Sequence, residues 1–206
     1  MSILVLSIQN YEATPWIMEK HYAKRMPSVS YAFGAYRSGE LIGVVTYGVP
    51  ASPSLCMGVC GTEWRGKVLE LNRLCCESTK NVASTLVGRS LAMLPKPSVV
   101  VSYADTAQGH VGYIYQATNW NYTGATKERT DMFAGDGKHS RHNRGDSSQR
   151  QTRSSKHRYV FFVGSATERK AMRKALMYPI EPYPKGESRR YDASATVQTQ
   201  GILFQT

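Results

Sequence analysis

The sequence predicts a single α/β domain in which a mixed, largely antiparallel sheet is flanked by helices. Three observations support this prediction: a length of 206 residues, an apolar content of 41%, and strand-type runs that alternate with helix-type segments. At ~150 residues per domain, the length indicates one domain with an additional tail. A chain of this size buries a core without disulfides or structural metals.

Runs rich in β-branched and aromatic residues predict the strands. An apolar run over residues 3–8 predicts the first strand. Two runs at 31–37 and 41–47, joined by Ser38-Gly39-Glu40, predict a hairpin. Four later runs complete the predicted strands: 68–74, 98–104, 120–124 and 158–163.

Helix signals lie between these runs. Thr14 followed by Pro15 is a typical helix start, so we expect a helix that carries His21 and stops before Pro27. Residues 50–66 contain three glycines and two prolines and predict a loop. Apolar spacing predicts three further helices: 81–94, 108–118 and 165–177.

Positive charge is concentrated in the second part of the chain. The net charge is +11, of which residues 1–120 contribute +3 and residues 121–206 contribute +8. This excess predicts a polyanionic partner, with double-stranded DNA favoured, and a solubilising surface is the alternative. Residues 134–158 lack large apolar side chains and predict a long basic loop. The residues expected to bind nucleic acid are Lys138, Arg141, Arg144, Arg150, Arg153, Lys156, Arg158, Arg169 and Arg173.

The changes in composition suggest four segments. We expect a core over residues 1–125, a basic and partly flexible insertion over 126–157, a last strand and basic helix over 158–184, and a tail over 185–206. No run approaches the ~20 apolar residues of a membrane span, and the apolar start has no basic leader. We therefore expect a cytoplasmic protein with reduced cysteines and no membrane partner. The sequence does not decide the oligomeric state, and a dimer is one of the alternatives.

The cysteine spacing does not predict a metal site. Cys56 and Cys60 are separated by three residues, and Cys75 and Cys76 are adjacent, unlike the Cys-x-x-Cys pattern of structural zinc.

Several short segments, taken in order, carry a family resemblance. They include Glu19-Lys-His-Tyr-Ala-Lys-Arg-Met-Pro27, Val68-Leu-Glu-Leu-Asn-Arg73, Val101-Ser-Tyr-Ala-Asp105, Gly109-His-Val-Gly-Tyr-Ile-Tyr-Gln-Ala-Thr-Asn-Trp120 and Lys156-His-Arg-Tyr-Val160. Together they resemble the Mom family of phage DNA-modification proteins over residues 14–184. The element order also follows that of the GNAT acyltransferases, which implies a GNAT-like acyltransferase fold. The resemblance implies a phage protein in the host cytoplasm that converts adenine to a carbamoylmethyl form, which shields DNA from restriction.

The resemblance also implies the site residues. His21 and Tyr22 match the family's His-Tyr pair, Asp105 matches the aspartate of its Ser-Tyr-Ala-Asp turn, and Tyr115 matches the tyrosine ten residues later. These four residues are expected to be catalytic. Four others are expected to bind substrate: Arg73 on the central strand, Ser90 in the following helix, Tyr103 and Tyr113.

The residue types are compatible with these roles and with simpler ones. Asp105 ends a buried strand, where its carboxylate accepts a proton from an amine or caps the next helix. His21 suits a general base, a metal ligand or a structural position. Tyr115 suits stacking on a flipped base or packing on the sheet. Arg73 lies in an apolar strand, so we expect it to pair with Glu70 or Asp105, or to bind a phosphate or carbonyl.

The donor remains open between two classes. GNAT enzymes that use coenzyme A carry a Gly-x-Gly turn before the helix, but residues 81–89 contain one glycine. Glycyl-tRNA is therefore favoured over a coenzyme A thioester, and tRNA joins DNA as a partner. Iron held by His21 and Asp105 is less favoured. Two alternatives to a DNA-adenine transferase are a coenzyme A-dependent acyltransferase acting on another amine and a non-catalytic nucleic-acid-binding protein.

Overall fold

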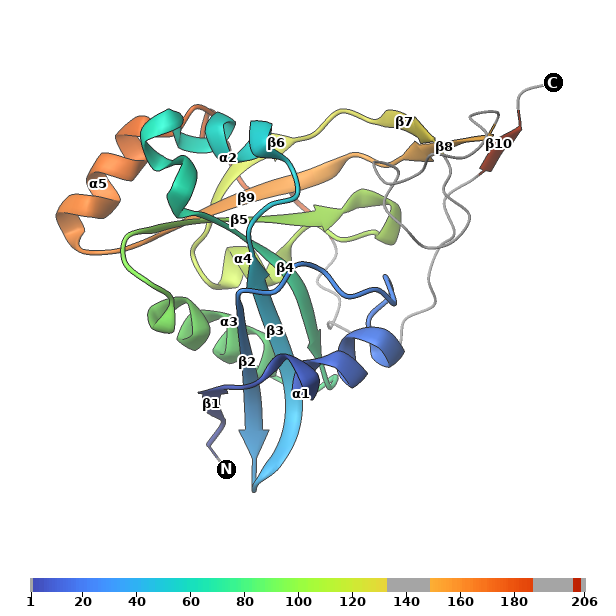
Figure 1. The fold of residues 1–206 in the computed structure, drawn as a ribbon, viewed down its shortest axis with the longest axis vertical. Helices are drawn as coiled ribbons and strands as arrows, with labels where there is room; N and C mark the ends of the chain where they lie inside the picture. The colour runs from blue at the N-terminus through green and yellow to red at the C-terminus, as the bar shows by residue number, and fades with distance from the viewer. Residues whose placement is uncertain (1, 133–148, 187–201, 205–206) are drawn as a thin grey trace.

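The structure is a computed structural model that describes residues 2–132, 149–186 and 202–204. Within them, one sheet has the strand order β1-β2-β3-β4-β5-β9-β6 and a smaller sheet has the order β10-β8-β7 (Figure 1). In the large sheet β4 and β5 run parallel, and the other neighbouring strands run antiparallel. This confirms the predicted fold class. The strands are β1 (Leu4–Ser7), β2 (Tyr31–Arg37), β3 (Glu40–Gly48), β4 (Val68–Cys76), β5 (Ser98–Asp105), β6 (Asn121–Ala125), β7 (Arg129–Met132), β8 (Gln149–Arg153), β9 (Lys156–Val163) and β10 (Ile202–Phe204).

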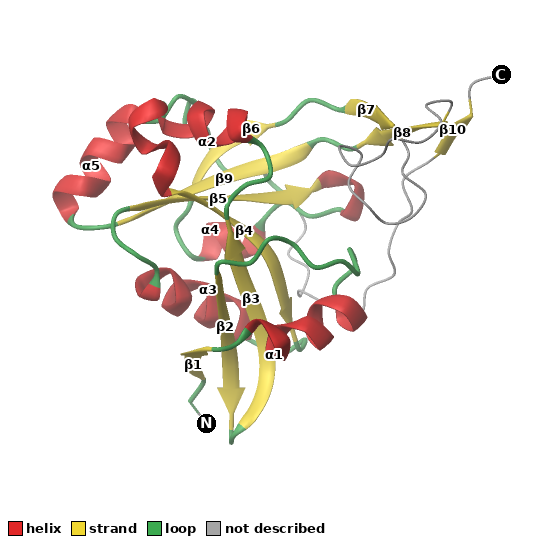
Figure 2. Ribbon diagram, viewed as in Figure 1, coloured by secondary structure: helices red, strands yellow, loops and turns green. Residues whose placement is uncertain are grey.

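Helices cover both faces of the large sheet (Figure 2). On one face, α3 and α4 bury a cluster that includes Val45, Leu71, Leu86 and Tyr115. The helical segments are α1 (Asn10–Pro15), η1 (Trp16–Lys20), α2 (Pro53–Cys60), η2 (Thr62–Lys67), α3 (Val82–Met93), η3 (Thr106–Gln108), α4 (Tyr113–Ala117) and α5 (Ala166–Ala175). None of the helices in the described residues is long and apolar enough to cross a membrane.

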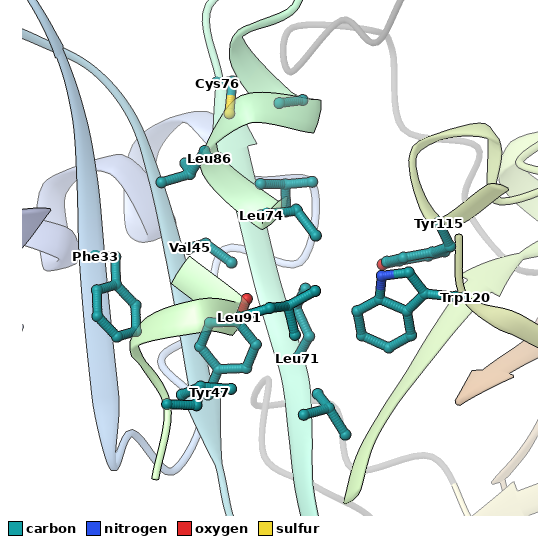
Figure 3. Close-up of a cluster of buried hydrophobic side chains, with 14 of the residues drawn as sticks. Phe33, Val45, Tyr47, Leu71, Leu74, Cys76, Leu86, Leu91, Tyr115 and Trp120 are labelled. Carbon is teal, nitrogen blue, oxygen red and sulfur yellow. The ribbon is translucent and has the colours of Figure 1, made fainter. Parts of the chain in front are cut away.

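The opposite face carries two separate clusters. Successive residues of a strand point to opposite faces, so Val44 packs under α1 and η1 while Val45 joins the α3 cluster. Further along the sheet, Val99 and Val101 pack with Met172 of α5 and with α2. Figure 3 shows the α3 cluster, with Tyr115 and Trp120 facing Leu71.

The first helix starts earlier and ends earlier than predicted. The N–H of Gln9 donates to the Glu12 carboxylate (2.8 Å), and this capping contact starts α1 at Asn10. Thr14 is therefore inside the helix, where its hydroxyl donates to the Asn10 carbonyl (2.8 Å). The π-helical turn η1 ends at Lys20, and His21 is extended (φ −78°, ψ 135°). His21 therefore follows the helix and does not lie on it.

The predicted loop at 50–66 contains helices. Ser52 accepts a hydrogen bond from the N–H of Leu55 (3.4 Å), and Pro53 occupies the first turn of α2. Val59 and Cys60 of this helix are buried against α5. Pro53 and Gly61 thus mark the two ends of α2, and the segment is not a structureless loop.

Part of the predicted basic loop forms strands. β8 pairs with β7, and β9 begins at Lys156, earlier than the predicted start at 158. Arg150 therefore lies in a strand. Three predicted nucleic-acid-binding residues, Lys138, Arg141 and Arg144, lie outside the described residues.

The cysteines are free and buried, as expected for reduced thiols: Cys56, Cys60, Cys75 and Cys76.

Candidate functional site

The central feature of the site is the separation of β4 from β5. The two strands pair from Val68–Val99 to Glu70–Val101 and then diverge (Figure 1). Beyond that point, the hydroxyl of Ser102 donates to the Leu71 carbonyl (2.9 Å) across the separation. Carboxyl ends of strands, where neighbouring strands part, are where ligands bind in open α/β sheets.

Tyr115 reaches this separation from α4. Its hydroxyl shares a hydrogen bond with Ser102 (2.8 Å), and its ring packs against Trp120 and Tyr159, each with a centroid distance of 5.1 Å. Burial raises the pKa of Tyr115, and the negative potential of Glu70 adds to that effect. The phenol therefore stays protonated at neutral pH, as a donor or acceptor of hydrogen bonds.

Asp105, at the end of β5, already has three partners. Lys156 Nζ lies 2.9 Å from its Oδ2, and Oδ1 accepts hydrogen bonds from the Ser154 hydroxyl (2.5 Å) and the Ala107 N–H (3.0 Å). Burial opposes charge on this carboxylate, but the bonds from Ser154 and Lys156 outweigh it and lower the pKa of Asp105. A carboxylate held in this way is a poor proton acceptor. Asp105 also caps η3, the simpler role that the sequence allows.

His21 and Tyr22 form an aromatic pair beside this end of the sheet. Their rings stack at 4.5 Å, and Tyr22 meets the edge of His110 at 6.5 Å. His21 Nδ1 accepts a hydrogen bond from the N–H of Ala23 (3.0 Å), so the neutral ring carries its proton on Nε2. Burial, with Arg73 and His110 nearby, lowers the pKa of His21 to about 3. His21 is therefore a hydrogen-bond donor near neutral pH, and the expectation of a general base does not fit this geometry.

Arg73 binds backbone carbonyls. Its Nε and Nη2 donate to the Arg25 carbonyl (3.2 and 3.0 Å), and its Nη1 donates to the Asn72 carbonyl (2.6 Å). Of the alternatives open from the sequence, the structure supports a carbonyl partner. Asp105 pairs with Lys156 instead. Arg73 thus fixes the segment that carries His21 and Tyr22.

The other predicted substrate-binding residues occupy three different environments. Tyr103 lies on β5 on the face that carries the α2 and α5 cluster. Tyr113 is 53% exposed on α4. Ser90 is fully buried and shares a hydrogen bond with Tyr47 (2.7 Å), so the structure does not bring it to the separation between the strands.

The comparisons with known proteins agree with this architecture. The sequence profile described as the Mom protein family matches residues 2–185. The chain belongs to the Mom protein family. It is 26% identical over 203 residues to the methylcarbamoylase mom of Escherichia phage Mu, covering 88% of this chain and 83% of that protein.

Solved structures show the fold of this Mom family member. Arabidopsis thaliana NAA60 in complex with acetyl-CoA has a TM-score of 0.51 at 13% identity, covering 79% of this chain and 99% of that chain. The ribosomal-protein-S18-alanine N-acetyltransferase of Escherichia coli has a TM-score of 0.48 at 8% identity, covering 80% and 96%. The likeness to the NAA60 structure confirms the expected GNAT-like fold.

The described basic residues differ in how free they are to bind nucleic acid. Arg158 donates to Thr123 Oγ1 and to the Thr123 carbonyl (2.9 and 2.8 Å) and stacks on the Tyr178 ring at 3.4 Å. Lys156 is held by Asp105. The structure thus gives both residues an internal role. In contrast, α5 exposes a row of cations: Arg169, Lys170, Arg173 and Lys174.

Two residues of this region were not predicted as site residues. Glu70 is half-buried on β4 where the strands part, and His110 meets Tyr22. The polar face of residues 70 and 72 was visible in the sequence, but the divergence of β4 from β5 was not.

The described residues do not support the iron alternative. No group of three or more His, Cys, Asp and Glu side chains there could hold a metal ion. His21 Nδ1 accepts the Ala23 N–H, and both oxygens of Asp105 are engaged, so these two residues do not fit an iron ion together.

Proposed function

We propose that this Mom family member is a phage DNA-modifying transferase that converts adenine to its N6-carbamoylmethyl form and protects DNA from restriction. The observation that carries the proposal is the family match over residues 2–185, together with a relative named a methylcarbamoylase. A transferase fold agrees with it. The exposed cations of α5 supply a surface to which a DNA backbone can bind.

A target adenine must leave the duplex to react, because its amine is paired inside the helix. The aromatic residues Tyr22 and His110 offer a surface on which such a base can stack. His21 Nε2–H is a hydrogen-bond donor suited to a carbonyl oxygen that gains charge during acyl transfer. The Tyr115 O–H is a second such donor when the Ser102 hydroxyl donates to the Tyr115 oxygen (2.8 Å) and not to the Leu71 carbonyl.

Glycyl-tRNA is the donor we propose. The adenine amine attacks the ester carbonyl, the ester C–O bond breaks, and the tRNA ribose hydroxyl leaves with a proton, which gives glycyl adenine. The free glycyl amine then attacks the ring carbon that bears the new amide and displaces it. The new bond forms between the glycyl nitrogen and the ring carbon as the old bond between that carbon and the amide nitrogen breaks. The proton that the glycyl amine loses passes to the departing nitrogen, so the original exocyclic nitrogen becomes the terminal amide of carbamoylmethyl adenine. These two reaction steps require no oxidant or reductant.

The test is mass spectrometry of nucleosides from DNA incubated with purified protein and charged glycyl-tRNA. Carbamoylmethyl adenine should form in this mixture and should be missing when uncharged tRNA is used. Product formed from acetyl-CoA alone, or formed only when iron is added, would contradict the donor. Unmodified DNA from cells that express the protein would contradict the function itself.

A further inference from the structure

Glu70 is a half-buried carboxylate that its surroundings leave without a direct partner. Among the residues that the structure describes, its side chain has no hydrogen bond and no ion pair. Even partial removal of a carboxylate from water is costly unless the charge is paired. An unpaired carboxylate at the centre of a sheet therefore requires an explanation other than stability.

Its position is the point at which the sheet opens. Glu70 is the last residue of β4 that pairs with β5, opposite Val101. Its backbone is thus anchored on both sides, because Glu70 also pairs with Gly48 of β3. The Glu70 side chain lies on the same face of the sheet as Val68, which belongs to the cluster that Tyr103 packs against. On this face, Glu70 lies between the region covered by α1 and the region covered by α2. A strand that is paired on both sides is a rigid support for a reactive group.

Charged and titratable groups approach Glu70 from five elements, yet none pairs with it. They are Arg73 on β4, Tyr103 on β5, Tyr115 on α4, Lys156 on β9 and Cys56 on α2. Both cations are committed elsewhere, Arg73 to the Arg25 carbonyl and Lys156 to Asp105. Burial raises the pKa of Glu70 more than Arg73 and Lys156 lower it, which makes the group a better base than an exposed glutamate.

We propose that Glu70 is the catalytic base that takes the proton from the attacking amine. This inference rests on the proposed function. As the amine nitrogen forms its bond to the donor carbonyl carbon, its N–H bond breaks and the proton passes to a Glu70 oxygen. The ester C–O bond then breaks, and the leaving oxygen takes up that proton, which restores the carboxylate. Asp105 acts instead as a positioning residue, since Lys156, Ser154 and Ala107 occupy its oxygens.

The test compares three variants with the wild type. Glu70→Gln keeps the size of the side chain and removes the base, Glu70→Asp keeps a carboxylate, and Glu63→Gln removes an exposed negative charge from η2 as the control. Single-turnover formation of carbamoylmethyl adenine is measured from pH 5 to 9. We expect Glu70→Gln to lower the rate by at least ~100-fold, Glu70→Asp to retain part of it, and Glu63→Gln to equal the wild type.

The pH profile separates a base from a structural residue. The wild-type rate should rise with pH through one ionisation above the ordinary carboxyl range, and Glu70→Asp should keep that rise while Glu70→Gln loses it. A Glu70→Gln rate within threefold of the wild type, or an unchanged profile, would overturn the inference. If Glu70→Gln does not fold, the wild-type and Glu70→Asp profiles decide. A wild type that forms no modified adenine would instead refute the proposed function.

Discussion

The ammonium group of Lys156 lies 2.9 Å from the carboxylate of Asp105. The two residues are paired where β5 ends and β9 begins. The carboxylate is 5% exposed and the lysine 33% exposed, so water screens the pair only in part. The ion pair closes the end of the sheet at which β5 stops and η3 begins.

Replacement of Lys156 by methionine should destabilise the fold. It leaves Asp105 buried without its cation, and we expect a loss of about 1–2 kcal/mol, less than for a fully buried pair. Urea denaturation at pH 7 measures this change. Lys170→Met on the exposed face of α5 is the control and should be neutral.

The Asp105–Lys156 ion pair also predicts that the stability of the fold depends on pH. Since the pKa of Asp105 is lowered by folding, its contribution is complete above the pKa of an unfolded aspartate, about 4, and is lost as the pH falls through the folded value. Stability should therefore decrease below pH 4 in the wild type and less steeply in Asp105→Asn. Identical acid slopes would show that the pair contributes little.

His21 should remain neutral well below its ordinary range. With a folded pKa of about 3 and an unfolded one near 6.5, only the unfolded chain gains a proton between pH 6.5 and 5. Acidification from pH 7 to 5 should thus cost up to about 2 kcal/mol of stability, and His21→Gln should remove this dependence. Nitrogen NMR of the ring should show the proton on Nε2. A titration near pH 6.5 would exclude this environment.

Tyr115→Phe should separate packing from chemistry. The ring contacts with Trp120 and Tyr159 remain, and Ser102 keeps the Leu71 carbonyl as its partner, so stability should change by less than about 1 kcal/mol. If the hydroxyl contacts the reacting carbonyl, adenine modification should fall at least ~10-fold. Tyr11→Phe, at a tyrosine of α1 that is 74% exposed, should behave like the wild type.

The cations of α5 should contribute to DNA affinity through charge alone. Arg169→Gln with Arg173→Gln should weaken binding to every sequence alike and lower the slope of log affinity against log salt by about 2. Lys67→Gln with Lys80→Gln removes two exposed cations from elsewhere and should leave the slope unchanged. Equal effects of the two double variants would indicate that DNA has no preferred face.

The strands of the large sheet were predictable because their patterns are local. The hairpin of residues 31–47 and the buried run after Ser98 are short runs, rich in β-branched and aromatic residues, that favour a strand. Helix starts were less predictable because two signals competed. Gln9 and Glu12 cap α1 ahead of Thr14. The helix start at Ser52-Pro53 lies in a segment whose glycines and prolines favour a loop.

The sequence pointed to only some of the residues of the candidate site and not to their roles. The family resemblance pointed to His21, Asp105 and Tyr115, and these residues lie on segments that border the strand separation. Which of them is free to react depends on tertiary partners, such as Lys156 for Asp105. Glu70 could not be singled out from the sequence, because its importance depends on where the pairing of β4 with β5 ends, and the sequence does not show that point.

Arg73 has a consequence for how loss-of-function variants of this protein should be interpreted. Its guanidinium ties the segment around Arg25 to β4, and the neighbouring Asn72 side chain ties Ser28 to the same strand (2.8 Å). These hydrogen bonds from Arg73 and Asn72 hold the segment that carries His21 and Tyr22 against β4. An inactive Arg73 variant would therefore resemble a catalytic mutant in a genetic screen, although the residue that it removes is an anchor.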